Sequence, residues 1–228
     1  MTDDPTPGFQ RARSAEQREI RKQTILDVAT ELLDEMPVGE ISLRELSRRV
    51  GLSKTNVVRY FETREAVFFE LLNRSLAQWT EELAGELSAA GPAAAPDQVA
   101  DTVARSLAAR PLLCGLLSAL GPELERNIST EAALEFKLAH GRLLGELAGL
   151  LRRHLAGLTE AEARELVSLT VVYTAGLWPF ANPSEAVAKA QEDPALADTR
   201  VDFAARLGRV LQIAVAGLSA ASFGRPRR

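Results

Sequence analysis

A pair of short helical segments that meet at Gly51 constrains the fold of this sequence more than any other feature. They lie in the stretch SLRELSRRVGLSKTNVVRYFETREAVFFELL, which runs from Ser42 to Leu72. Glycine permits a left-handed turn at low cost, and the small Ser47 just before it lets two helices cross closely. The apolar positions around the turn lock the second helix against the first, namely Leu46, Val50, Leu52 and Val57. This spacing predicts a helix-turn-helix, whose second helix enters the major groove of DNA.

The side chains that the second helix turns outward suit contacts with DNA. Ser53 is the expected N-cap, and the free amides at this positive helix end suit a phosphate group. The outward positions that follow offer donors and acceptors for base edges and phosphates, and they are Lys54, Thr55, Asn56 and Arg59. We therefore expect this helix to be the one that reads DNA.

Basic residues gather around this region, although the whole chain has a formal net charge of -4. Residues 42–64 contain six basic and two acidic side chains, and residues 11–22 contain five basic and two acidic ones. A protein that is acidic overall can still present one basic face to a partner. For any single arginine, an ordinary solvated charge is the competing interpretation. The segment 11–22 is either a groove or backbone contact or a frayed terminus.

Helical periodicity continues along almost the whole chain, and no β-alternation of useful length and no repeat are present. The first helix is expected to stop at Pro37 and Gly39, and the third to run to about Tyr60. The expected N-caps of the first four helices are Ser14, Ser42, Ser53 and Thr63, with Gln17 and Glu45 as capping-box partners of the first two.

The remainder of the sequence is rich in leucine and alanine. The segment 89–98, AAGPAAAPDQ, contains two prolines and is predicted to be a connection. The later helices are expected at 97–109, 111–120, 129–155, 159–178 and 200–221, with Thr159 and Glu162 as a capping box. Residues 183–199 contain two prolines and mixed charge, and we expect a loop there. The fold class predicted from this pattern is all-α.

The segment from Ser14 to Leu72 resembles the TetR/AcrR family of bacterial transcription regulators. The family pattern has a Ser- or Thr-capped second helix, a Gly-[Val/Leu]-Ser turn, an aromatic pair that ends a short recognition helix, and a basic residue that opens helix four. In this sequence these features are Ser42, GLS at 51–53, the pair Tyr60 and Phe61, and Arg64 in place of the usual lysine. The resemblance implies a three-helix DNA-binding domain followed by a larger helical ligand-binding and dimerisation domain.

The resemblance also implies which residues contact DNA. Arg44 is the expected guanine reader, which the bidentate geometry of arginine supports, and Lys54, Thr55 and Asn56 are the other base-edge candidates. The phosphate candidates are Ser42, Ser53, Arg59, Tyr60 and Arg64. For Tyr60, packing in the core is the alternative, while Phe61 is assigned to the core and Arg48 and Arg49 to the solvated surface.

Two departures from the family pattern bear on the operator. Val58 stands where the family often has a tyrosine, so that one usual phosphate contact is absent. Thr55 and Asn56 are polar where small residues are frequent, which suggests direct hydrogen bonding and a distinct operator sequence.

The expected organisation has four parts. These are a flexible arm at 1–13, the helix-turn-helix domain at 14–62, a connecting helix at 63–88 and the effector-binding and dimerisation domain at 89–228. The resemblance implies a homodimer through helices 159–178 and 200–221, reading a palindromic double-stranded operator. The charge-free runs that begin at Leu166 and Val210 support this, because they are too apolar to leave in water. The alternative is that one run only lines the core of the subunit.

A ligand pocket inside the second domain is a further implication of the family. Candidate lining residues are polar or aromatic groups set among apolar helices, namely Cys114, Phe136, His140, Tyr173, Thr174 and Trp178. Because few charges fall in these helices, the expected effector is largely apolar. Each of these side chains is otherwise a satisfied core residue. The alternative function is a dimeric DNA-binding protein without a small ligand, whose second domain only dimerises or binds a protein.

An enzyme is the rival of a different class. His140 and His154 lie about 21 Å apart on one expected helix, which is too far to share a metal or a proton. No nucleophile motif, phosphate-binding glycine loop or Cys/His metal spacing is present. We therefore expect no catalysis, no cofactor and no metal. The single Cys114 fits a reducing compartment, and no secretory signal or membrane span is expected, which together predict a cytoplasmic, nucleoid-associated protein.

Overall fold

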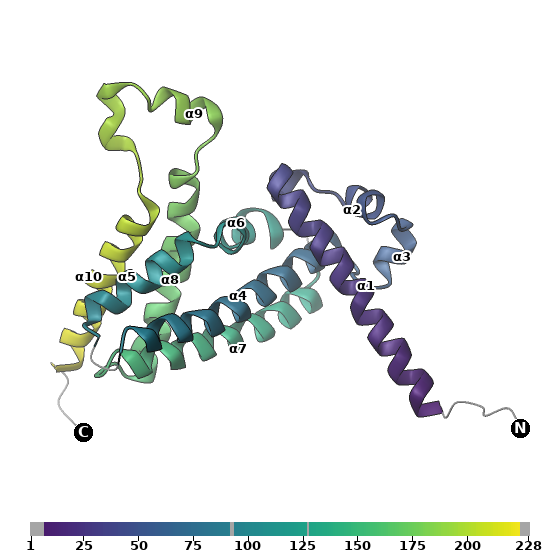
Figure 1. The fold of residues 1–228 in the computed structure, drawn as a ribbon, viewed down its shortest axis with the longest axis horizontal. Helices are drawn as coiled ribbons and strands as arrows, with labels where there is room; N and C mark the ends of the chain where they lie inside the picture. The colour runs from purple at the N-terminus through teal and green to yellow at the C-terminus, as the bar shows by residue number, and fades with distance from the viewer. Residues whose placement is uncertain (1–6, 92–93, 127, 224–228) are drawn as a thin grey trace, which may run out of the picture. The chain divides into compact units, whose positions relative to one another are not determined.

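The predicted all-α fold is confirmed. A computed structural model describes residues 7–91, 94–126 and 128–223, with side chains for 16–91, 94–126 and 128–220, and these residues form helices and no strand (Figure 1). The chain divides into two compact units, Met1–Leu71 and Leu72–Arg228. The division falls inside one long helix, whereas the sequence suggested that this helix be set apart as a separate connecting part.

The first unit holds the helix-turn-helix. Its elements are α1 (Pro7–Glu35), the short 3-10 helix η1 (Val38–Glu40), α2 (Leu43–Val50), α3 (Lys54–Val58) and the start of α4 (Arg64–Ala89). α1 packs on α2, and α2 packs on α3. The core between them is formed by fully buried apolar side chains, among them Ile25, Ile41, Leu46, Val57 and Phe68. This packing fixes how α3 is held against α2.

The turn between α2 and α3 follows the prediction. Ser42 Oγ accepts the amide of Glu45 at 3.1 Å, and Gly51 takes the left-handed conformation with φ 73°. The amide of Leu52 donates to the carbonyl of Ser47 at 3.0 Å, which closes the helix end after the glycine. Ser47 is itself buried, as a close helix crossing requires.

Three details of the first unit differ from the prediction. α1 begins at Pro7, so residues 7–13 are helical and Ser14 lies inside the helix, which means that the N-cap role predicted for Ser14 is wrong; residues 1–6 of the expected arm lie outside what is described. The carboxylate of Glu45 pairs with Arg48, and this exposed ion pair replaces the expected capping box. α3 ends at Val58 rather than Tyr60, because the chain tightens there into shorter-range backbone hydrogen bonds.

The second unit is a helical assembly that begins with the later part of α4. Its elements are α5 (Pro96–Ala108), α6 (Pro111–Ala119), the π-helical turn η2 (Leu120–Leu124), α7 (Thr130–His154), α8 (Glu160–Ala181), α9 (Glu185–Ala190), the 3-10 helix η3 (Pro194–Thr199) and α10 (Phe203–Phe223). α8 packs against α6, α7 and α10, and α10 also packs closely on α5. The predicted capping box of α8 is present, with Thr159 and Glu162 exchanging both hydrogen bonds.

α8 continues through Pro179 to Ala181, beyond the end that the sequence suggested. Proline has no amide hydrogen, so the carbonyl of Ala175 one turn earlier loses its usual helical partner. Ser118 of α6 donates its hydroxyl to that carbonyl at 3.0 Å. The proline is therefore accommodated by a hydrogen bond between helices, which ties α6 to α8.

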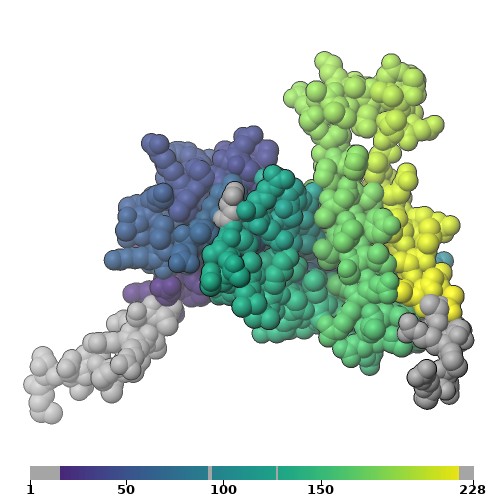
Figure 2. Space-filling model, turned by 180° about the vertical axis from the view of Figure 1, so that it is seen from behind, coloured from purple at the N-terminus to yellow at the C-terminus, as the bar shows by residue number. Residues whose placement is uncertain are grey.

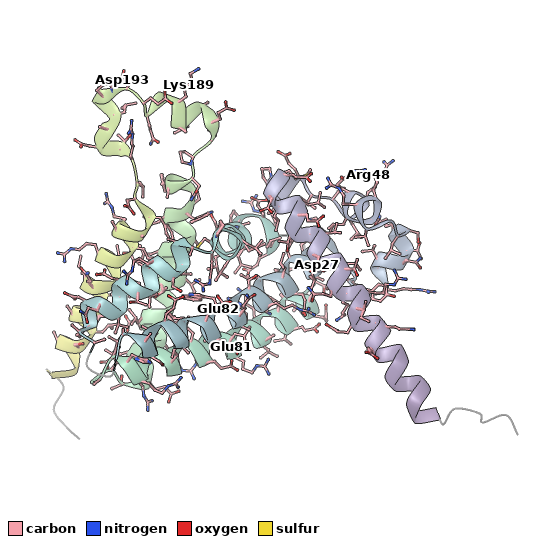
Figure 3. The ribbon with its side chains drawn as sticks, viewed as in Figure 1. Asp27, Arg48, Glu81, Glu82, Lys189 and Asp193 are labelled. Carbon is pink, nitrogen blue, oxygen red and sulfur yellow. The ribbon has the colours of Figure 1, made fainter. Side chains whose placement is uncertain are left out.

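Residues 183–199 were expected to be a loop, and this prediction is wrong. They form α9 and η3, which extend away from the ends of α8 and α10 (Figures 1 and 2). Lys189 and Asp193, labelled in Figure 3, lie on this segment, and its side chains are exposed almost throughout. The six residues of α9 are too few for periodicity to identify, but Glu185 in its first turn and Lys189 in its last suit the helix dipole.

Candidate nucleic-acid interface

The α2–α3 pair presents four unpaired polar side chains to solvent. Arg44, Lys54, Thr55 and Asn56 are exposed, and none forms a side-chain hydrogen bond or ion pair with another described residue. Unpaired donors and acceptors on an exposed helix are free to bond a partner without first breaking a contact. The residues predicted from the sequence to read base edges therefore share one accessible region of the first unit.

Arg48 and Arg49 differ from Arg44 in that each forms an ion pair with a glutamate. Arg48, labelled in Figure 3, donates to Glu45, and Arg49 donates to both carboxylate oxygens of Glu35 at 2.8 and 2.6 Å. The hydrogen bond from Arg49 also holds the pKa of Glu35 below its ordinary value. Both guanidinium groups are thus neutralised within the chain, which agrees with their assignment to the surface.

Arg64 is placed differently from the prediction. Its Nη1 donates to the carbonyls of Val38, Gly39 and Ile41 at 3.1, 3.2 and 3.2 Å, and its Nε donates to Glu65. These carbonyls lie in the connection between α1 and α2, in and directly after the 3-10 helix η1. Because its donors are used inside the fold, we assign Arg64 to holding this connection rather than to contacting a phosphate.

The remaining phosphate candidates lie around α3. Ser53 Oγ accepts the amide of Asn56 at 3.2 Å, so it caps α3 from an exposed position, as Ser42 caps α2. Arg59 is exposed at the other end of α3. Tyr60 is half-buried, and the guanidinium carbon of Arg18 lies 5.5 Å from its ring centroid. The ring therefore packs within the unit, while Phe61 is buried as expected.

The interior candidates of the second unit fall into two groups. Phe136 and His140 of α7 stack with ring centroids 5.0 Å apart, and His140 Nδ1 lies 2.8 Å from Oδ1 of Asn73 on α4. Thr174 and Trp178 lie on α8, where Trp178 meets the edge of Phe203 with centroids 5.1 Å apart. The hydroxyl of Thr174 is fully buried and has no hydrogen-bond partner among the described residues.

The other two predicted pocket residues, Cys114 and Tyr173, lie in different environments. The Cys114 sulfur is buried and lies 3.3 Å from the carbonyl of Leu107. Tyr173 is 41% exposed, so the structure places its ring on the outer face of α8 instead of in the interior. A groove of about 310 Å³ between α7 and α8 is lined mainly by apolar atoms of other residues, including Leu144, Val167 and Val171. Among the described residues, no group of three or more His, Cys, Asp or Glu side chains could hold a metal ion.

Asn73 is the site residue that sequence reasoning missed. It is separated from His140 by 67 positions, and nothing in its own neighbourhood of the sequence marks it as a hydrogen-bond partner. Burial and the nearby charge of Lys137 together lower the pKa of His140, and Glu125 acts in the opposite direction. The neutral imidazole is therefore the form that this site favours.

The lowered pKa of His140 predicts a pH dependence of stability. As the pH falls below about 6.5, the unfolded chain takes up a proton that the folded chain resists, so the free energy of unfolding decreases. We expect His140→Gln to flatten this dependence between about pH 7.5 and 5. Urea unfolding at a series of pH values measures it, with His154→Gln as the control. A parent slope retained in the His140 variant would contradict the assignment.

A second prediction concerns the only cysteine. Burial raises the pKa of the Cys114 thiol to about 12. Since the thiolate is the reactive form, we expect alkylation of the native protein at pH 8 to be at least about 100-fold slower than alkylation of the unfolded chain. The rate of iodoacetamide labelling, followed by mass spectrometry with and without urea, checks this. Comparable rates would show that the α5–α6 contact opens readily in the native state.

The fold and the exposed side chains of the first unit indicate the class of protein. A chain whose described residues are helical, with a glycine-turn helix-turn-helix that exposes polar side chains on its second helix, has the form of a DNA-binding regulator. Sequence profiles agree: the one described as "Bacterial regulatory proteins, tetR family" matches residues 25–71, and "Tetracyclin repressor-like, C-terminal domain" matches residues 73–222. The chain belongs to the TetR family of bacterial transcriptional regulators.

Solved structures share the fold at low sequence identity. The regulator FadR from Bacillus subtilis in complex with stearoyl-CoA is 18% identical, with a TM-score of 0.56, covering 86% of this chain and 98% of its own. The fatty acid degradation regulator FadR from Bacillus halodurans is 15% identical, with a TM-score of 0.54 and the same coverage. A transcriptional regulator from Rhodococcus sp. Rha1 is 22% identical, with a TM-score of 0.50, covering 92% and 99%. No curated protein sequence matches the chain.

Proposed function

We propose that this protein is a repressor that binds a palindromic operator as a homodimer and leaves it when a small, largely apolar effector binds. It acts in the cytoplasm, associated with the nucleoid, and has no catalytic role. The observation that carries the proposal is the exposed, unpaired set formed by Arg44, Lys54, Thr55 and Asn56 on the α2–α3 pair. Arginine bonds guanine and asparagine bonds adenine in the major groove, so two of these side chains suit base readout directly.

The phosphate contacts of the proposed complex come from residues beside that set. Serine caps place the free amides of helix N-termini next to the DNA backbone, and arginine and tyrosine supply further donors. We assign these contacts to Ser42, Ser53, Arg59 and Tyr60.

The homodimer is supported by apolar surface that a single chain leaves exposed. Val172 and Phe180 on α8 are 62% and 68% exposed, and Ile213 on α10 is 57% exposed. The same two helices contain small residues that allow close helix approach, such as Gly176 on α8 and Gly217 on α10. The segment Pro194–Ala220 is long and apolar enough to span a membrane, yet only 28% of its apolar stretch is buried within the chain. A second copy of α8 and α10 would cover this face and form a four-helix bundle.

The effector proposal is supported by the interior of the second unit. A buried hydroxyl without a partner costs free energy, and a ligand that bonded Thr174 would recover it. The aromatic side chains Phe136 and Trp178 supply apolar surface. One relative of similar fold was solved with stearoyl-CoA, whose long acyl chain is apolar, so compounds with a long acyl chain are the first to test. A ligand can release DNA only if it binds the DNA-free conformation more tightly.

A DNA-binding protein without a small ligand is the second candidate. The observation that favours it is the close contact of Cys114 and Phe136 with their neighbours, since packed side chains leave no room for a ligand. Failure of every apolar compound to change DNA binding, together with selective operator binding, would support this candidate.

The proposed function is tested by fluorescence anisotropy of the purified protein with the DNA upstream of its own gene and with an unrelated duplex, each at two salt concentrations. We expect tight, site-selective binding that weakens with salt and weakens again when the effector is added. If the upstream duplex and every fragment from a genomic selection bind no better than the unrelated duplex, the regulator proposal fails.

A further inference from the structure

A hollow on the first unit combines the exposed half of α1 with the end of α3. It has a volume of about 620 Å³ and is lined by Gln17, Arg18, Ile20, Arg21, Arg59 and Tyr60. Four of these residues precede residue 25, where the match to the family profile begins. The hollow is therefore formed largely by a part of the chain that the family profile does not include.

The three arginines of this hollow concentrate positive charge, and none of the described residues that line it carries a carboxylate. Arg21 and Arg59 are exposed and form no ion pair with any described residue. This contrasts with Arg48 and Arg49, whose guanidinium groups are both paired with glutamates. Like charges placed three residues apart on a helix repel one another, and an anion bound between Arg18 and Arg21 would relieve this repulsion.

Contacts within the hollow hold one arginine in place. Arg18 Nη2 donates to the carbonyl of Arg59 at 3.1 Å, and its guanidinium carbon lies 5.5 Å from the centre of the Tyr60 ring. A guanidinium group has five donors, and the bond to Arg59 uses only one of them. The remaining donors of Arg18 are thus positioned at the C-terminal end of α3, where Arg59 is the cap residue.

The position of the hollow at the end of α3 indicates which anion would bind there. A helix that lies in the major groove has sugar-phosphate backbone on both sides, and its ends approach that backbone. We propose that this hollow seats one backbone phosphate of the operator in each subunit, with Arg18 and Arg21 of α1 closing on it together with Arg59 of α3. Ile20, which is 59% exposed, offers an apolar edge to the adjoining deoxyribose. This proposal rests on the proposed function, because it requires α3 to lie in the groove.

The contact adds affinity and carries no sequence information, because every phosphate is chemically alike. Each phosphate neutralised on duplex DNA contributes about 0.9 to the slope of log K against log salt. Two hollows per dimer therefore contribute about 1.8 to that slope, and about 30-fold in affinity at 0.15 M salt.

The experiment compares the parent with Arg18→Gln/Arg21→Gln, in full-length protein, by anisotropy titrations on the operator and on an unrelated duplex over a series of salt concentrations. Glutamine retains helix propensity and removes the positive charge. We expect the slope to fall by about 1.8 and affinity to fall about 30-fold on both duplexes, with their ratio unchanged. Arg152→Gln/Arg153→Gln removes the same charge from exposed positions on α7 and should leave the slope unchanged.

A set of operators, each with one backbone phosphate replaced by a neutral methylphosphonate, identifies the phosphate that binds in the hollow. The parent should lose about 5-fold at one symmetry-related position outside the contacted bases, and the Arg18/Arg21 variant should be insensitive there. An unchanged salt slope, or equal sensitivity of parent and variant at every position, overturns the hollow as a phosphate seat. If the parent itself binds no duplex selectively, it is the proposed function that fails, and the two failures are thus distinguishable.

Discussion

Replacing Arg44 and Asn56 together with alanine is expected to weaken binding to the operator by at least about a thousandfold. Each bidentate contact to a base is worth about 1–3 kcal/mol of discrimination, and a dimer would lose four of them. Even at the lower limit the loss is about 4 kcal/mol, which corresponds to about three orders of magnitude in affinity. Both side chains are exposed and unpaired in the free protein, so their removal should leave the fold intact.

The measurement is a pair of titrations on the operator and an unrelated duplex, with thermal unfolding as a check on folding. Affinity for the unrelated duplex should fall little, because non-specific binding is electrostatic. Arg48→Ala is the matched control, since this exposed arginine of the same helix is paired with Glu45 and should change operator affinity little. An equal loss on both duplexes would show that Arg44 and Asn56 contact the backbone and do not read bases.

The features that could be predicted from the sequence are mainly those that depend on interactions between neighbouring residues. Ser42, Gly51 and Thr159 act on backbone groups within a few residues of themselves, so their roles follow from short-range spacing alone. The helix-turn-helix, the capping box of α8 and the all-α class were predictable for this reason. Each depends on the order of residues along the chain and hardly on where distant segments meet.

The errors concern side chains whose partners are distant in sequence or whose helix face is ambiguous. Arg64 lies at the predicted position, but its carbonyl partners are 23–26 residues away, and only the folded chain shows that its donors are used. Tyr173 and Thr174 are neighbours with opposite environments, 41% and 0% exposed. The sequence around them is apolar on all sides, so periodicity could not identify the inner face.

The apolar character of α8 and α10 on nearly all sides also underlies the prediction of how two chains assemble. Both helices are apolar around most of their circumference, and the chain covers only part of it: Leu166 and Leu211 are 3% and 2% exposed, whereas Val172 and Ile213 remain open to solvent. Since α8 packs on α10, their open faces can adjoin and offer one apolar surface. Exposed apolar surface of this kind is typical of interaction sites, which is why we propose the dimer contact here.

Introducing charge at this surface should abolish the proposed dimer and, with it, the proposed operator binding. We expect Val172→Glu/Ile213→Glu to be monomeric at micromolar concentration, because four unpaired carboxylates would be placed in a closed interface. A monomer has one reading helix in place of two, so its affinity for a palindrome should fall to that of a single half-site, at least about a hundredfold weaker.

Light scattering coupled to size-exclusion chromatography measures the mass, and anisotropy measures binding to whole and half operators. Leu134→Glu is the matched control: this leucine of α7 is 59% exposed but lies outside the proposed surface, so this variant should remain dimeric and bind normally. If the double variant retained the parent's mass, the α8–α10 face would not be the interface. If it became monomeric yet bound the whole palindrome as tightly as the parent, recognition would not depend on two reading heads held at a fixed spacing, and the homodimeric operator complex would have to be abandoned.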